Sequence, residues 1–96
     1  MLLKDQTSVI TGCNKGIGKE ILKQFSENGS DIFACVRKLD KEFQLTIEEL
    51  KSEYKNNIIP LELDLSNKES VIDTAKKIIS YKLKINNLIN NAGGIS

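Results

Sequence analysis

Hydrophobic residues fall into two kinds of pattern along the chain. Short runs of aliphatic and β-branched residues are each followed by a longer stretch in which apolar residues recur every three or four positions. The short runs indicate strands, and the three-to-four spacing indicates helices with one apolar face. We predict strands at 8–11, 31–36, 57–65 and 86–90, and helices at 16–28, at 40–54 and from a capping box at 66–69 to about residue 83.

The strand patterns also predict the order of the sheet. Residues 31–36 are almost continuously apolar, which suits a strand covered on both faces. Pro60 lies inside the third run, and a residue without an N–H is tolerated mainly at a sheet edge. Alternating strands and helices require a parallel sheet with right-handed crossovers. We therefore predict an α/β fold, a Rossmann-type three-layer structure with strand order 3-2-1-4 and the third helix alone on its face.

Glycines gather where the first strand meets the first helix, as T-G-C-N-K-G-I-G over 11–18. We expect Gly12 to allow a tight turn, Gly16 to let a ligand approach the backbone, and Gly18 to let the helix pack closely. The free N–H groups and positive dipole end of this helix favour a phosphate. With order 3-2-1-4, the loop and residues 90–93 should border one crevice. For the glycines alone, a turn that binds nothing remains the alternative.

Composition narrows the range of functions. The chain has 96 residues, enough for one small domain, and a net charge of +1, which gives no general attraction for nucleic acid or an anionic membrane. It has no histidine, and its two cysteines, Cys13 and Cys35, are too few for a zinc site or a disulfide framework. No metal site is expected. Without a signal peptide or a run of roughly 18 apolar residues, we expect a cytoplasmic protein.

Three segments together resemble the N-terminal half of a classical short-chain dehydrogenase/reductase. They are the glycine loop at 11–18, the acidic residue Asp64 after the third strand, and N-N-A-G at 90–93, in the family's order and at about its spacing. The resemblance implies that residues 1–96 are the N-terminal part of an NAD(P)-binding domain, with the glycines at the pyrophosphate. The residues expected to bind cofactor are Gly12, Asn14, Lys15, Gly16, Ile17, Gly18, Arg37, Asp64, Leu65, Asn91, Ala92 and Gly93. As ordinary structure, Asp64 would be a turn carboxylate and the asparagines a strand-end turn.

Charge near the end of the second strand bears on which cofactor is preferred. Relatives that prefer NAD carry an acidic residue where this chain has Val36, and Arg37 follows it. Lys15 in the glycine loop can reach the same corner. Two cations without an anion favour NADPH over NADH, because both bind a 2′-phosphate. The alternative is that Lys15 and Arg37 are ordinary surface charges.

No catalytic residue is assigned. The family uses a serine and a Y-x-x-x-K segment, whereas Tyr54 and Tyr81 are followed four residues later by Ile58 and Ile85. We therefore expect a fragment that carries the cofactor-binding half of a carbonyl reductase, similar to 3-oxoacyl-carrier-protein reductases, whose full-length form acts on a small carbonyl or alcohol and is a homo-oligomer. The alternative is a standalone module that binds nucleotide or oligomerises without catalysis.

Overall fold

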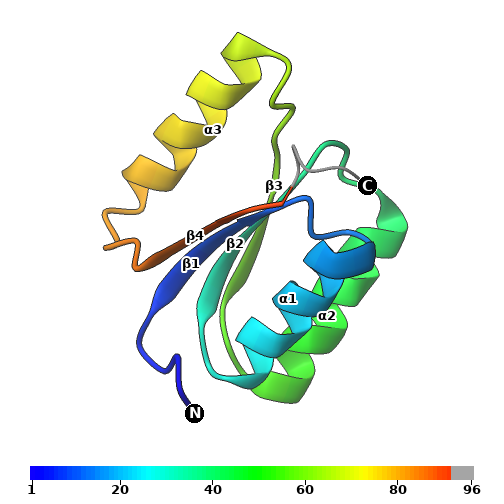
Figure 1. Ribbon diagram of the computed structural model, residues 1–96, viewed down its shortest axis with the longest axis vertical. Coiled ribbons are helices and arrows are strands. Elements are labelled where there is room, and N and C mark those ends of the chain that lie inside the picture. Colours follow the sequence, from blue (N-terminus) through cyan, green and yellow to red (C-terminus); the bar gives the residue numbers. More distant parts are fainter. Residues whose placement is uncertain (92–96) are drawn as a thin grey trace.

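The computed structural model describes residues 1–91, which form a parallel sheet with helices on both faces (Figure 1). The strand order is β3-β2-β1-β4, and the predicted fold class and order are confirmed. Helices α1 and α2 cover one face of the sheet, and α3 lies over the other (Figure 1). In chain order the elements are β1 (Thr7–Thr11), α1 (Gly16–Glu27), β2 (Asp31–Val36), α2 (Lys41–Tyr54), β3 (Ile58–Glu62), α3 (Lys68–Ser80) and β4 (Asn87–Asn90).

Strand β1 occupies the interior of the sheet. Its last residue, Thr11, is opposite Cys35 of β2 on one side and Asn90 of β4 on the other. Strand β3 pairs with β2 at the opposite edge, and Pro60 stands beside Ala34 in that ladder. The edge position of β3 was predicted from Pro60 and is confirmed, because a residue without a donor disturbs an edge strand least.

The main core lies between the sheet and the pair α1 and α2. Alternate strand residues point to this face, since side chains along a strand change sides at every position. Each fully buried aliphatic or aromatic side chain contributes about 1.5–3 kcal/mol to folding. The buried residues of this main core are Ile10, Cys13, Leu22, Ile32, Ala34, Val36, Phe43, Ile47, Leu50 and Ile58.

The opposite face has a smaller core, formed by Val9, Phe33 and Cys35. Only Thr74 of α3 is buried, whereas Ile79 is 71% exposed. Figure 1 shows α3 standing alone over this face. The second face is therefore covered far less completely than the first.

Two predicted boundaries of the third strand and helix are wrong. Strand β3 ends at Glu62 rather than at residue 65, although the N–H of Leu63 still donates to the carbonyl of Val36 at 2.8 Å. Helix α3 ends at Ser80, and Lys82 has a left-handed φ of 56°, so Leu83 lies beyond the helix. The three-to-four spacing of apolar residues continues in the sequence to Leu83, although the backbone leaves the helix before that residue.

The predicted capping box at 66–69 is also wrong. The cap of α3 is Asn67, whose side-chain oxygen accepts from the N–H of Ser70 at 3.1 Å. Ser66 is engaged elsewhere, because its N–H and hydroxyl both donate to Asp64. Within residues 1–91, no helix is long and apolar enough to cross a membrane.

Candidate functional site

The three glycines of the loop between β1 and α1 differ in their surroundings. Gly12 and Gly16 have left-handed φ angles of 63° and 60°. Space beside Gly16 is open, with no atom within 4 Å of where a Cβ would stand. A Cβ on Gly18 would overlap the carbonyl oxygen of Gly12 and lie 2.6 Å from Nδ2 of Asn91. These surroundings agree with the turn, the open approach and the close packing that the sequence predicted.

Helix α1 begins without a side-chain cap. Its N-cap residue, Lys15, accepts no hydrogen bond through its side chain, and no acidic residue lies in the first turn. The other two helices are capped by Asp40 and Asn67 and carry Glu42 and Glu69 in their first turns. The chain therefore leaves the positive end of α1 uncompensated beside an open glycine, an arrangement that favours an anion from outside.

The end of β4 is bonded directly to the glycine loop. The hydroxyl of Thr11 donates to Oδ1 of Asn90 at 2.9 Å, and the N–H of Asn91 donates back to that hydroxyl at 3.0 Å. Nδ2 of Asn91 donates to the carbonyl of Gly12 at 3.1 Å. Two segments about eighty residues apart are thus joined, as predicted. Ala92 and Gly93 lie outside the described residues.

The outer part of the glycine loop is exposed, and the residue before it is buried. Asn14 and Lys15 are exposed, and Ile17 is 75% exposed, so an apolar side chain faces outward from the first turn of the uncapped helix. Cys13 is fully buried beneath them, with its Sγ 3.7 Å from the carbonyl of Cys35. Burial, the larger cause, and the neighbouring Cys35 raise the pKa of Cys13 to about 12. The thiol therefore stays protonated and is part of the floor of the loop rather than a nucleophile.

Two of the sequence-predicted residues form an ion pair at the ends of β2 and β3. Nε of Arg37 lies 3.8 Å from Oδ2 of Asp64, and their side chains are 82% and 32% exposed. Hydrogen bonds from Ser66, and to a smaller extent Arg37, hold the pKa of the Asp64 carboxyl below its ordinary value. The expectation that no anion lies at this corner is therefore wrong. The nearness of these two residues could have been predicted from the strand order, because residues that follow adjacent parallel strands are neighbours.

The remaining features lie away from the loop. A cavity of about 360 Å³ opens at the amino ends of the strands, beside Thr7 and Asp31, and one of about 220 Å³ lies between α2 and β3. Leu65, also predicted to bind cofactor, is 43% exposed beyond the end of β3. Among residues 1–91, no group of three or more His, Cys, Asp or Glu side chains could hold a metal ion.

Known proteins similar to this chain share both its sequence pattern and its fold. It is 31% identical over 93 residues to 3-oxoacyl-[acyl-carrier-protein] reductase of Buchnera aphidicola and 33% identical over 92 residues to human retinol dehydrogenase 11. These matches cover 97% and 95% of this chain but 36% and 29% of the relatives, so the chain spans about a third of their length.

A solved structure extends the likeness to the backbone. L-sorbose reductase from Gluconobacter frateurii, complexed with NADPH and L-sorbose, superposes with a TM-score of 0.87 at 26% identity, over 98% of this chain and 35% of that one. The family model for short chain dehydrogenases matches residues 6–96. Since the match includes both the glycine loop and the strand bonded to it, the chain belongs to the short-chain dehydrogenase family.

Proposed function

We propose that this chain is the NADPH-binding part of an oxidoreductase that reduces a carbonyl, or oxidises an alcohol, by hydride transfer. The observation that carries the proposal is the uncapped start of α1, preceded by a glycine loop that Asn91, just after β4, bonds through the carbonyl of Gly12. Residues 1–96 would form the N-terminal part of the NAD(P)-binding domain. The family membership and the span of about a third of the relatives' length support this reading.

The described residues fit a dinucleotide. The start of α1 has no side-chain cap and no acidic side chain in the first turn, which suits a pyrophosphate. The open space at Gly16 would let the phosphates approach the backbone, and the exposed Ile17 offers an apolar contact to a ring. When bound, the nicotinamide supplies the hydride. The residues proposed to hold the cofactor are Gly12, Asn14, Lys15, Gly16, Ile17, Gly18, Arg37, Asp64, Leu65 and Asn91.

The preference for NADPH rests on Arg37. Its guanidinium is 82% exposed at the end of β2, where Val36 carries no charge to repel a 2′-phosphate. Lys15 adds a second exposed cation on the loop. The fork of a guanidinium binds phosphate oxygens through charge-assisted hydrogen bonds. That the similar L-sorbose reductase was solved with NADPH agrees with this choice.

A purified chain titrated with NADPH and NADH tests the preference. We expect tighter binding of NADPH, and we expect Arg37→Asp to erase or reverse a difference of about tenfold, the size of one lost charge-assisted hydrogen bond. Lys38→Asp is the matched control, because it makes the same charge change one residue further on and should alter the ratio less. Equal binding of both cofactors, before and after the Arg37 change, would contradict the preference.

A standalone nucleotide-binding or oligomerising module remains the second candidate, favoured by the observation that the described chain has a complete core under α1 and α2. Neither reading expects this chain to reduce a carbonyl by itself, because no catalytic residue is assigned in it. The solution state beside the titration separates the two: a monodisperse, folded chain that binds NADPH tightly fits the module, whereas precipitation fits a part of a longer reductase. Its relatives have names as different as acyl-carrier-protein reductase and retinol dehydrogenase, so the substrate stays at the level of a carbonyl or alcohol. The cytoplasmic location and the homo-oligomeric full-length form stay predictions.

A further inference from the structure

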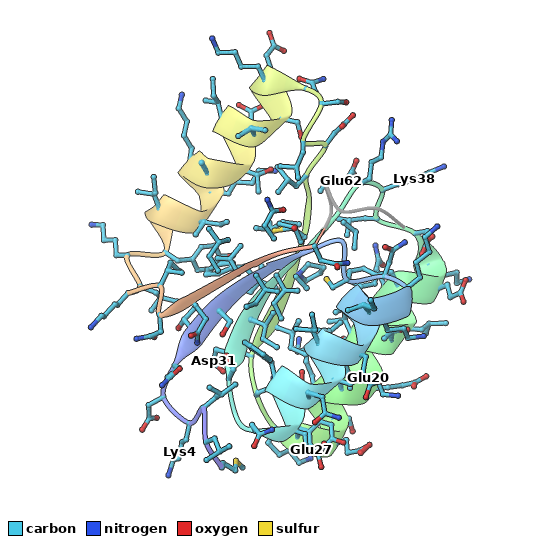
Figure 2. All side chains as sticks on the ribbon, viewed as in Figure 1. Lys4, Glu20, Glu27, Asp31, Lys38 and Glu62 are labelled. Atoms are coloured by element: carbon cyan, nitrogen blue, oxygen red, sulfur yellow. The ribbon has the colours of Figure 1, made fainter. Side chains whose placement is uncertain are left out.

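The ion pair between Arg37 and Asp64 places an anion beside the residue proposed to attract a phosphate. Strands β2 and β3 run parallel with Val36 opposite Glu62, so the residues that follow each strand emerge together. Figure 2 shows their chain neighbours, Lys38 and Glu62, at the same end of the molecule. The contact uses Nε of Arg37, which is one edge of the guanidinium.

The carboxylate of Asp64 is held in place by its own turn. Oδ1 accepts from the N–H of Ser66 at 3.0 Å and from its hydroxyl at 2.6 Å, which leaves Oδ2 directed at Arg37. The N–H of Asp64 donates to the hydroxyl of Ser70 at 3.0 Å, so the backbone is fixed as well. Both donors of Ser66 would have to be given up for this charge to move away from Arg37.

The exposed ion pair adds little to stability, since such pairs are worth about 0–1 kcal/mol. Its effect on a second anion is larger. Any dianion that binds the same guanidinium comes within the Debye length, about 8 Å at physiological ionic strength, of the fixed carboxylate. Repulsion across several ångströms of water-like dielectric corresponds to roughly threefold to tenfold in affinity for a dianion.

We propose that Asp64 is a specificity-determining residue that limits the preference of this site for a 2′-phosphorylated nucleotide, by holding a fixed negative charge against Arg37. The inference rests on the proposed function and deepens it. Arg37 attracts the 2′-phosphate, Asp64 opposes it, and Ser66 keeps the opposition in place. The ratio of the two cofactor affinities is then set by a pair of residues, one beyond the end of each of two adjacent strands.

Calorimetric titration with adenosine 2′,5′-bisphosphate and with 5′-AMP tests the proposal, because these probes differ only in the 2′-phosphate. We expect Asp64→Asn to raise the ratio of the bisphosphate affinity to the 5′-AMP affinity by about threefold to tenfold, because a lost contact to the adenosine part that both probes share cancels in the ratio. The asparagine keeps an acceptor for Ser66, so the turn should persist. Raising the salt concentration should shrink the gain, since screening weakens the repulsion.

Two further variants make the test specific. Glu27→Gln removes an equal charge at the far end of α1 and should change neither affinity (Figure 2). Ser66→Ala removes one of the two hydrogen bonds that hold the carboxylate and keeps its charge, so it should give a smaller gain for the bisphosphate than Asp64→Asn. An unchanged or lower ratio of bisphosphate affinity to 5′-AMP affinity in Asp64→Asn, with wild-type binding intact, overturns this inference alone. Failure of the wild-type chain to bind either probe overturns the proposed function and this inference together.

Discussion

At the scale of single residues, Gly16 and Gly18 are glycines for different reasons. Gly16 has a left-handed φ of 60° and open space where a side chain would stand. Gly18 lies inside the first turn of α1, where any side chain would meet the carbonyl of Gly12 and the amide of Asn91. The lack of a side chain at Gly16 keeps the surface of the loop free, and the lack of one at Gly18 lets α1 approach the end of the sheet.

Alanine should therefore destabilise the protein at both positions, but should weaken cofactor binding mainly at Gly16. Gly18→Ala should lower the free energy of unfolding by about 1–3 kcal/mol, the usual cost of forcing atoms into a packed site. Gly16→Ala should cost about 1–2 kcal/mol for its left-handed backbone, but should weaken NADPH binding more than Gly18→Ala does in the folded protein. Urea unfolding and cofactor titration measure the two effects. A Gly16→Ala variant that binds NADPH as tightly as wild type would contradict this assignment.

At the scale of elements, the helices differ in how they begin. Asp40 caps α2 by accepting from the N–H of Phe43 at 2.8 Å, and Asn67 caps α3 in the same way. Lys15 stands at the corresponding position of α1 with an extended backbone, φ −159° and ψ 166°, but offers no acceptor. A cap usually contributes about 1 kcal/mol. Its absence here is consistent with a ligand that takes its place.

Supplying the missing cap should stabilise the helix and weaken the site. Lys15→Ser adds an acceptor that can bind the N–H groups of the first turn, whereas Lys15→Ala removes the same cation without adding one. We expect the serine variant to be about 0.5–2 kcal/mol more stable than the alanine variant, and to bind NADPH less tightly than it. Thermal unfolding and cofactor titration of this pair provide the measurement. Equal NADPH affinities in both variants would show that the N–H groups do not contact the cofactor.

At the scale of the whole molecule, the two faces of the sheet are unequal. Helix α2 buries Phe43, Ile47 and Leu50, whereas α3 buries only Thr74. Leu88 of β4 is 68% exposed at the edge of the sheet. Stability should therefore be concentrated in β1, β2 and the helices α1 and α2, because local opening costs least where few apolar contacts are lost.

Hydrogen exchange should reveal this asymmetry directly. We expect the amides in the middle of α3 to exchange well before those in the middle of α2, although the helices are similar in length, at 13 and 14 residues. Mass spectrometry of peptides from each helix gives both rates in one sample, with α1 as a second reference. Equal protection in α2 and α3 would mean that the α3 face is more tightly packed than its burial indicates.

The sequence was sufficient for the arrangement of the elements because each rule acts locally. Pro60 marked the edge strand, and the glycine spacing marked the turn into α1. The sequence did not show which residue caps α3, since Ser66 and Asn67 are both good caps. In the structure Ser66 donates two hydrogen bonds to Asp64, and Asn67 is the residue that caps α3. The predicted strand order made Arg37 and Asp64 neighbours, but their pairing depends on the direction of the Asp64 carboxylate, which the turn at Ser66 fixes.

The central claim is that the glycine loop and the end of β4 together hold one dinucleotide. Amide chemical shifts followed by NMR during an NADPH titration test it most directly. We expect shifts to change together, with one dissociation constant, in residues 12–18 and in Asn90 and Asn91. Perturbations confined to other parts of the chain, or in one segment without the other, would contradict the account.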